Sequence, residues 1–256
     1  MFNFTWNEFF CFIILVFRSG GILKGMPFFG GEIVPTQVKI CLSLVLAIIL
    51  MPVVTIRISS RIPNHFSLIW LAMSEILIGL IIGFAAKLIF EGIQLSGQLV
   101  GFQIGLAVAN VMDPLTQNQI SIFAHMEFMV ALLIFLSLNA HHIFLEAIVK
   151  SFEIVPPMCF NPEGAMMTKI INLSGGVFVI ALQIGAPVIA ALLFTNACFG
   201  IMARLVPQMN VFFVAMPIGI AVGILVLGGT MPYFYAFLRK SFSSMAKDML
   251  ILLKVM

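Results

Sequence analysis

The sequence predicts an all-α membrane protein with about six long apolar helices arranged in hairpins. Of its 256 residues, 62% are hydrophobic and only 9% are charged, whereas about a quarter of the residues in a soluble domain are charged. The apolar residues form runs of the length that a helix needs to cross a bilayer, about 17–25 residues. Proline and glycine gather between these runs, where they end helices. We therefore expect lipid or partner proteins to cover most of the surface.

Six apolar segments are candidates for spanning helices. They cover residues 7–23, 38–56, 68–90, 126–149, 171–202 and 211–238. The fifth is long enough to be bent or broken near Pro187, because proline removes a helical hydrogen bond. A short amphipathic helix is expected over 239–254. The first segment lacks a preceding basic stretch and a cleavage site, so we expect it to be retained as a membrane helix.

Residues 92–118 do not fit the pattern of a lipid-facing helix, because several amide side chains interrupt the apolar run. Small residues recur there at every fourth position, and a shorter stripe of the same kind follows later in the chain. On a helix such stripes let another helix approach closely. The residues expected at these helix contacts are Gly97, Gly101, Gly105 and Ala109, with Gly219 and Gly223 in the second stripe.

Two interpretations of 92–118 remain open from the residues alone. The segment could be a tightly packed helix in a bundle. It could also be a mobile or pore-facing element, since glycines, amides and a helix stop at Asp113–Pro114 suit a segment that lines a water-filled path. The spacing does not separate these two interpretations.

Ionisable residues at membrane depth are costly, so they usually pair, face the interior or mark a pathway. Lys87 and Glu91 are four positions apart and are expected to pair on one helical face. Glu75 lies deepest in its apolar run, and a proton-relay role is a weaker alternative for it. For Arg18 two interpretations stay open: binding a partner's carboxylate or carbonyl groups, or extending toward the membrane interface.

The sequence contains no motif that predicts catalysis, a metal site or a cofactor. The zinc-protease, nucleophile-elbow, phosphate-loop and dinucleotide fingerprints are absent. The four cysteines show no paired spacing, and the adjacent His141 and His142 point in different directions on a helix. The net charge of +3 is too small to indicate nucleic acid as a partner. We therefore expect neither an enzyme nor a metalloprotein.

Four ordered stretches resemble one family closely. They read RSGGILKGMPFFGGEIVPTQVKICLSLVLA (18–47), GQLVGFQIGLAVANVMDPLTQN (97–118), FLSLNAHHIFLEAIVKSFEIVP (135–156) and APVIAALLFTNACFGIMARLVPQMNVFFVAMPIGI (186–220). Together they span nearly the whole chain, and their order makes the resemblance specific. They are similar to the FliR family of flagellar export proteins, which has a close counterpart in virulence injectisomes.

The resemblance implies a subunit of the type III protein export gate in the bacterial inner membrane, multi-pass and located at the flagellar basal body. Its implied partners are FliP-like and FliQ-like subunits, other export-apparatus membrane proteins, lipid and the unfolded exported proteins. It further implies a FliP-like part over 1–170 and a FliQ-like hairpin with a tail over 171–256. Some helices of that family lie above the bilayer within the assembly.

Two sites are implied by the same resemblance. A pore plug would fall on 103–118, with Gln103, Ile104, Gly105, Leu106, Val108, Asn110, Asp113, Pro114 and Asn118. The hairpin tip would form an entrance turn, with Arg204, Pro207, Gln208 and Asn210. The alternatives are an injectisome export-gate subunit or a secondary transporter. A transporter predicts paired intramembrane charges and two related halves, and the halves of this chain show no such symmetry.

Overall fold

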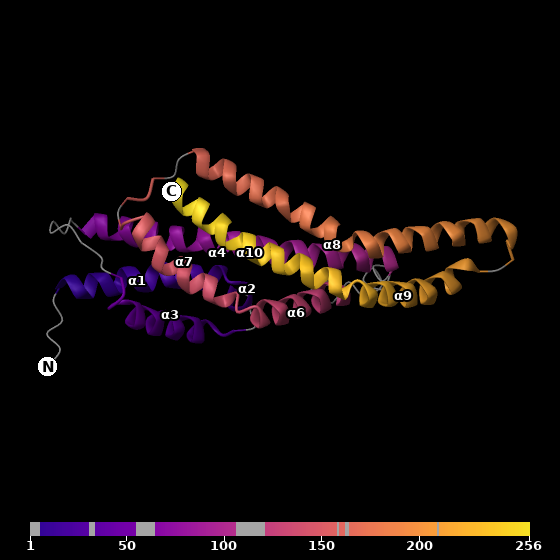
Figure 1. Ribbon diagram of the computed structural model, residues 1–256, viewed down its shortest axis with the longest axis horizontal. Helices are drawn as coiled ribbons and strands as arrows, with labels where there is room; N and C mark the ends of the chain where they lie inside the picture. Colours follow the sequence, from indigo (N-terminus) through magenta and orange to yellow (C-terminus); the bar gives the residue numbers. More distant parts are fainter. Residues whose placement is uncertain are drawn as a thin grey trace. The chain divides into compact units, whose positions relative to one another are not determined.

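The structure, a computed structural model, describes residues 6–30, 34–54, 65–105, 121–157, 159–161, 164–208 and 210–256. All regular structure in these ranges is helical, as Figure 1 shows. The helices are α1 (Trp6–Gly25), α2 (Pro27–Gly30), α3 (Thr36–Leu50), α4 (His65–Ile104), α6 (Ile122–Ser137), α7 (His141–Ile154), α8 (Gly164–Leu205), α9 (Val211–Gly229) and α10 (Met231–Val255). The prediction of an all-α protein is therefore confirmed.

Within the described residues, fewer helices qualify as candidate membrane spans than the sequence predicts. Within the described residues, two helices are long and apolar enough to cross a membrane, Ile69–Ile104 and Gly164–Leu205. The number rises to four if the interrupted pairs α6–α7 and α9–α10 each count as one span. The predicted span 126–149 is interrupted by a turn in which Asn139 has a φ of 53°. The prediction of six spans is not confirmed.

Helices α4 and α8 are much longer than a bilayer requires. They contain 40 and 42 residues, which at 1.5 Å per residue makes each about 60 Å long. The hydrocarbon layer is about 30 Å thick, so each helix is about twice as long as that layer. The hydropathy of the sequence predicted a span that ends at residue 90, because the amide side chains that follow are not typical of a membrane-spanning helix.

Helix α8 runs without a break through Pro187, where the sequence predicted a bend or break. Proline has no N–H, so the carbonyl of Gln183, one turn earlier, lacks its helical donor. The hydroxyl of Tyr233 on α10 donates to that carbonyl oxygen at 3.4 Å. A side chain from another helix therefore replaces the hydrogen bond that the proline removes.

The chain divides into two compact units, each built from separate stretches of sequence. Unit 1 comprises Met1–Leu88, Asn139–Ser174 and Phe242–Met256, and unit 2 comprises Ile89–Leu138 and Gly175–Ser241. These two units are defined by which residues pack together in the structure. The predicted division at residue 170 is defined differently, by the resemblance of each part to another subunit. That division remains a prediction.

In unit 1, glycines bring α1 and α4 into direct backbone contact. A Cβ atom added to Gly21 would lie 2.8 Å from the carbonyl oxygen of Ile76, and one added to Gly83 would lie 2.6 Å from the Cα of Gly25. Distances this short leave no room for a side chain. The spacing of Gly79 and Gly83 in the sequence indicates such a contact, and the structure shows it.

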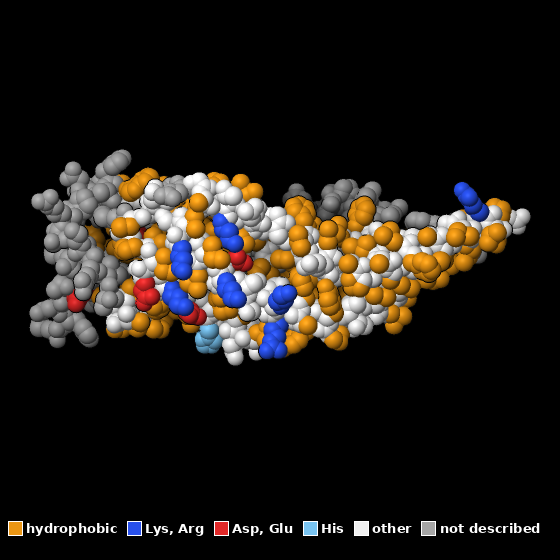
Figure 2. Space-filling model, turned by 45° about the horizontal axis from the view of Figure 1, so that its top comes forward, with side chains coloured by type: hydrophobic (Ala, Val, Ile, Leu, Met, Phe, Trp, Pro, Cys, Tyr) orange, Lys and Arg blue, Asp and Glu red, His pale blue; other side chains and the backbone are white. Residues whose placement is uncertain are grey.

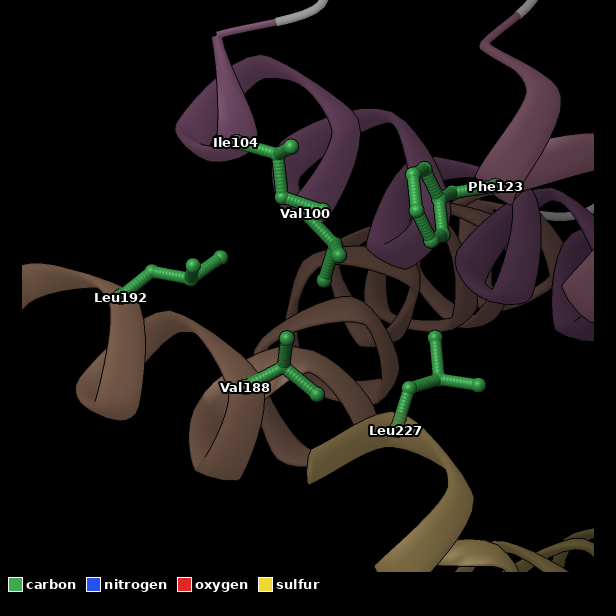
Figure 3. Close-up of a cluster of buried hydrophobic side chains, with 6 residues drawn as sticks. All are labelled: Val100, Ile104, Phe123, Val188, Leu192 and Leu227. Atoms are coloured by element: carbon green, nitrogen blue, oxygen red, sulfur yellow. The ribbon is translucent and has the colours of Figure 1, made fainter. Parts of the chain in front are cut away.

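In unit 2, the buried core is formed by side chains from four helices, which Figure 3 shows pointing toward one another. Its buried residues are Val100 and Ile104 of α4, Phe123 of α6, Val188 and Leu192 of α8, and Leu227 of α9. The end of α4 is thus held by α6, α8 and α9.

The surface of the molecule is unusually apolar. Figure 2 shows hydrophobic side chains spread over the visible face between a small number of charged ones. Phe194 of α8, Leu205 of α8 and Phe213 of α9 are each about three quarters exposed, at 73%, 75% and 74%. Large apolar side chains that face outward along whole helices indicate contact with lipid or with other proteins.

Candidate functional site

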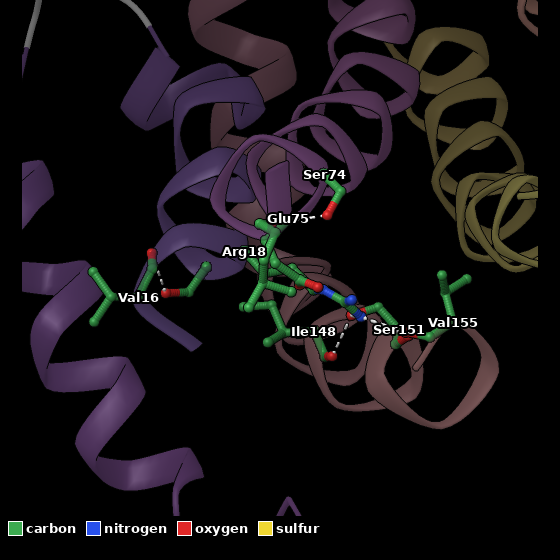
Figure 4. Close-up of polar contacts among 9 residues, drawn as sticks. Val16, Arg18, Ser74, Glu75, Ile148, Ser151 and Val155 are labelled. Atoms are coloured by element: carbon green, nitrogen blue, oxygen red, sulfur yellow. Dashed lines mark hydrogen bonds and ion pairs between the residues drawn. The ribbon is translucent and has the colours of Figure 1, made fainter. Parts of the chain in front are cut away.

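A fully buried ion pair lies at the centre of unit 1, where Figure 4 shows side chains from three helices converging. Nε of Arg18 on α1 donates to Oε2 of Glu75 on α4 at 2.5 Å, and both side chains are 0% exposed. Nη1 of Arg18 also donates to the carbonyl oxygens of Ser151 and Val155 at 2.7 and 3.0 Å. The guanidinium therefore links α1, α4 and the C-terminal end of α7.

The structure differs from both interpretations of Arg18 that the sequence left open. Its side chain does not extend to an interface, and its carboxylate partner, Glu75, belongs to the same chain. The guanidinium carbon also lies 4.0 Å from the ring centre of Phe152, a cation–π contact. Opposite charges inside apolar stretches of α1 and α4 could have suggested the pair, but the two residues are 57 positions apart in the sequence. The pair holds helices together.

The other two predicted intramembrane charges lie one turn apart on α4. Lys87 is exposed and Glu91 is half-buried. Their spacing permits the i, i+4 pairing that the sequence indicates, and the pairing remains a prediction.

Two of the predicted packing glycines lie where α4 meets α6 in unit 2. A Cβ atom on Gly97 would lie too close to the Cα of Ala124 and 2.7 Å from its backbone nitrogen. A Cβ atom on Gly101 would lie too close to the hydroxyl oxygen of Ser121 and 3.0 Å from its Cβ. At Gly97 the obstacle is backbone and cannot move aside, whereas at Gly101 it is a small side chain.

Gly105 has a different role from the other members of its stripe. It follows the last residue of α4, has a φ of 90° and donates its N–H to the carbonyl oxygen of Phe102 at 3.1 Å. Among the described residues, no atom lies within 4 Å of a Cβ placed there. A positive φ favours glycine, so Gly105 ends the helix and redirects the chain. Ala109, the fourth member, lies outside the described residues.

Ile104, at the start of the predicted plug, is part of the unit 2 core. It is 4% exposed, and its Cδ1 would lie 2.7 Å from a Cβ added to Gly223 on α9. Its carbonyl oxygen would lie 3.6 Å from a Cβ on Gly219. The two α9 glycines therefore accommodate the end of α4. Gln103 is half-buried.

The rest of the predicted plug falls outside the described residues. This applies to Leu106, Val108, Asn110, Asp113, Pro114 and Asn118. The two ends of that segment are described, however. It begins after Gly105 and ends before Ser121, which contacts the Gly101 position.

The predicted entrance turn joins α8 to α9. Its four predicted residues are all exposed: Arg204, Pro207, Gln208 and Asn210. Helix α8 ends with the N–H of Val206 bonded to the carbonyl oxygen of Met202 at 3.0 Å. The turn is thus an exposed polar connection between two apolar helices.

Glu127 on α6 is a buried acid that the sequence analysis did not select as a site residue. It is 4% exposed, and its Oε2 has no hydrogen-bond partner among the described residues. A glutamate inside an apolar run was the available signal. Within the described ranges, no group of three or more His, Cys, Asp or Glu side chains is placed to hold a metal ion.

Comparison with known proteins gives a consistent family. The profile described as "Bacterial export proteins, family 1" matches residues 9–245. The flagellar biosynthetic protein FliR of Bacillus subtilis is 34% identical over 238 residues, which cover 91% of this chain and 90% of that protein. FliR of Escherichia coli is 29% identical over 231 residues, covering 88% and 86%, and FliR of Aquifex aeolicus is 26% identical over 229 residues, covering 89% and 88%.

Proposed function

Because the chain belongs to the bacterial export proteins, family 1, the family of the flagellar biosynthetic protein FliR, we propose that it helps to form and close the secretion pore of the flagellar export gate. It is a subunit of the flagellar type III export apparatus. This family membership favours a flagellar protein over the transporter and injectisome alternatives, since the three relatives compared with the chain are flagellar proteins.

The residues that flank segment 106–120 support the proposal that this chain closes a pore. We call these residues, Ile104, Gly105 and Ser121, the stem. Ile104 is fixed in the unit 2 core, and Gly105 turns the chain out of α4. The chain returns at Ser121, against Gly101 on the same helix. The described residues that flank 106–120 therefore both lie at the end of α4. Apolar side chains of the segment between them would close a channel by excluding water.

The exposed apolar faces of α8 and α9 support assembly with other membrane subunits. Phe194, Leu205, Phe213 and Leu225 are each more than 70% exposed. A protein acting alone seldom exposes so many large apolar side chains. The proposed partners are FliP-like and FliQ-like subunits and other export-apparatus proteins, in the inner membrane at the flagellar basal body, with unfolded exported proteins as the cargo.

Cysteine crosslinking from the entrance turn tests this assignment. The four native cysteines are free, so they are first replaced by serine and motility is checked. Gln208→Cys is then expressed with the complete export apparatus and treated with a short crosslinker. We expect an adduct with another export subunit, and no such adduct when the chain is expressed alone. Capture of lipid only, in cells that contain the complete apparatus, contradicts the proposal.

A further inference from the structure

The buried carboxyl of Glu127 lies in unit 2, near side-chain hydroxyl groups and, among the described residues, without an ion-pair partner. Its side chain is 4% exposed. It lines a cavity of about 10 Å³ that is also lined by Thr230, Tyr233 and the apolar side chains Val188 and Leu227. A cavity of this size holds at most about one water molecule. The cavity lies at Thr230, the residue between the end of α9 at Gly229 and the start of α10 at Met231, where the two helices are bent by 55°.

Polar atoms without partners converge on this carboxyl. Oε2 of Glu127 and the hydroxyl of Ser96 both lack a hydrogen-bond partner among the described residues, although Ser96 is 0% exposed. The Ser96 hydroxyl would lie 3.2 Å from a Cβ added to Gly185 on α8, so that glycine leaves room beside it. Buried polar groups are almost always hydrogen-bonded, and the Ser96 hydroxyl lies close enough to the Glu127 carboxyl to interact with it. A proton on the carboxyl would let the two groups share a hydrogen bond without a buried charge.

No cation among the described residues compensates a negative charge on Glu127. None of the described ion pairs includes it, and α9 contains no ionisable residue. On α8 within unit 2 the charged residue is Arg204, in the exposed entrance turn. On α10 the cavity is lined by Tyr233, whose hydroxyl bonds to the Gln183 carbonyl oxygen.

The remaining titratable groups on the neighbouring helices are more exposed than Glu127. His125 on α6 is exposed, Arg239 and Lys240 on α10 are exposed, and Glu91 on α4 is half-buried. A buried carboxylate without a counter-charge is very unfavourable, whereas a neutral carboxylic acid can donate one hydrogen bond and accept another.

From this arrangement we propose that Glu127 is a proton-binding site, occupied at neutral pH, whose acid group is hydrogen-bonded to the Ser96 hydroxyl. The ligand is a proton; a sodium ion would need several further oxygen ligands that an apolar cavity of this size does not provide. Loss of the proton would place a charge beside the junction of α9 and α10 and would loosen the packing there.

Infrared spectroscopy of the purified complete export complex tests the site. The wild-type complex should show the carbonyl stretch of a protonated carboxylic acid, and Glu127→Gln should remove one carboxyl's share of that band. The matched control is Glu146→Gln, an exposed acid paired with Lys150, which should leave the band unchanged. An unchanged band in Glu127→Gln overturns the proposal, as does a band that depends on sodium.

Two further measurements cover the case in which Glu127→Gln does not assemble. Ser96→Ala keeps the acid and removes its hydrogen-bonding neighbour, so the band should shift while keeping its intensity. The wild-type complex should also lose thermal stability as the pH rises from acid through neutral, because the unfolded chain releases this proton at a lower pH than the folded complex does. Where Glu127→Gln assembles, it should lose less over the same range. Equal losses in the two complexes, or no response of the band to Ser96→Ala, count against the site.

Discussion

Arg18 and Glu75 lie 57 positions apart in the sequence and form an ion pair of 2.5 Å in which neither side chain is exposed. The same guanidinium satisfies two carbonyl oxygens near the end of α7. Three helices of unit 1 therefore depend on one side chain, and removing it would leave both a charge and two carbonyl groups without partners.

Removal of one member of this pair should be strongly destabilising. We expect Arg18→Ala or Glu75→Ala to cost about 3–5 kcal/mol, because each leaves an uncompensated buried charge. The double change Arg18→Met with Glu75→Leu should recover part of that loss. The readout is the thermal transition and yield of the purified assembly. The exposed pair Lys150 and Glu146 is the control, since Lys150→Ala should cost at most about 1 kcal/mol. Equal losses at the two pairs would contradict this account.

Gly97 should tolerate no side chain at all. Gly97→Ala places a methyl group on the backbone of Ala124, and overpacking of this kind costs about 1–3 kcal/mol. Gly101→Ala should cost less, because the Ser121 side chain can rotate away. Gly175→Ala on α8 is the control, since no described atom lies within 4 Å of its Cβ position. The stability order measured for the three assembled variants tests this, and a Gly97→Ala complex as stable as Gly175→Ala would show it to be wrong.

Gly105 should matter for its conformation and not for its contacts. Gly105→Ala meets no neighbour, but a residue with a side chain is strained at a φ of 90°, which costs on the order of 1–2 kcal/mol. Gly105→Asn should lose less, because asparagine adopts positive φ more readily. The free-energy order Gly, then Asn, then Ala is expected in unfolding measurements. If Ala and Asn prove equally mild, the turn is not required.

Pro187 and Tyr233 should show energetic coupling. Tyr233→Phe removes the donor to the Gln183 carbonyl oxygen, a loss of about 0.5–1.5 kcal/mol for a net hydrogen bond. In a Pro187→Ala background the restored N–H at position 187 can bond to that carbonyl, so Tyr233→Phe should cost less there. A double-mutant cycle on thermal stability measures the coupling. Additive losses would show that the hydroxyl does not substitute for the missing helical bond.

The sequence predicted the helical class correctly because composition and apolar run length are properties of the chain itself. Its prediction of six spans is not confirmed, since hydropathy does not distinguish a surface that faces lipid from one that faces another helix. The small-residue spacing indicated close helix contact, and Gly97 lies in one. The same spacing did not reveal that Gly105 ends the helix, because that depends on the backbone conformation after Ile104.

The pairing of Arg18 with Glu75 and the cavity at Glu127 could not be predicted from local patterns. Each depends on which helices meet, and helices α1 and α4, or α6 and α10, are far apart in the sequence. The only available signal was that charged residues in apolar helices need compensation. That rule identifies the residues but does not identify their partners.

Leakage through the assembled gate is the most direct test of the claim that this chain helps to close the pore. Deleting residues 106–116 leaves the stem, formed by Ile104, Gly105 and Ser121, in place, so the assembly should still form. Cells that express the deletion with the other export subunits are then compared with wild type for entry of ions or a small dye. We expect a recovered complex together with a leaky membrane. An assembled deletion complex that is as tight as wild type would contradict the account.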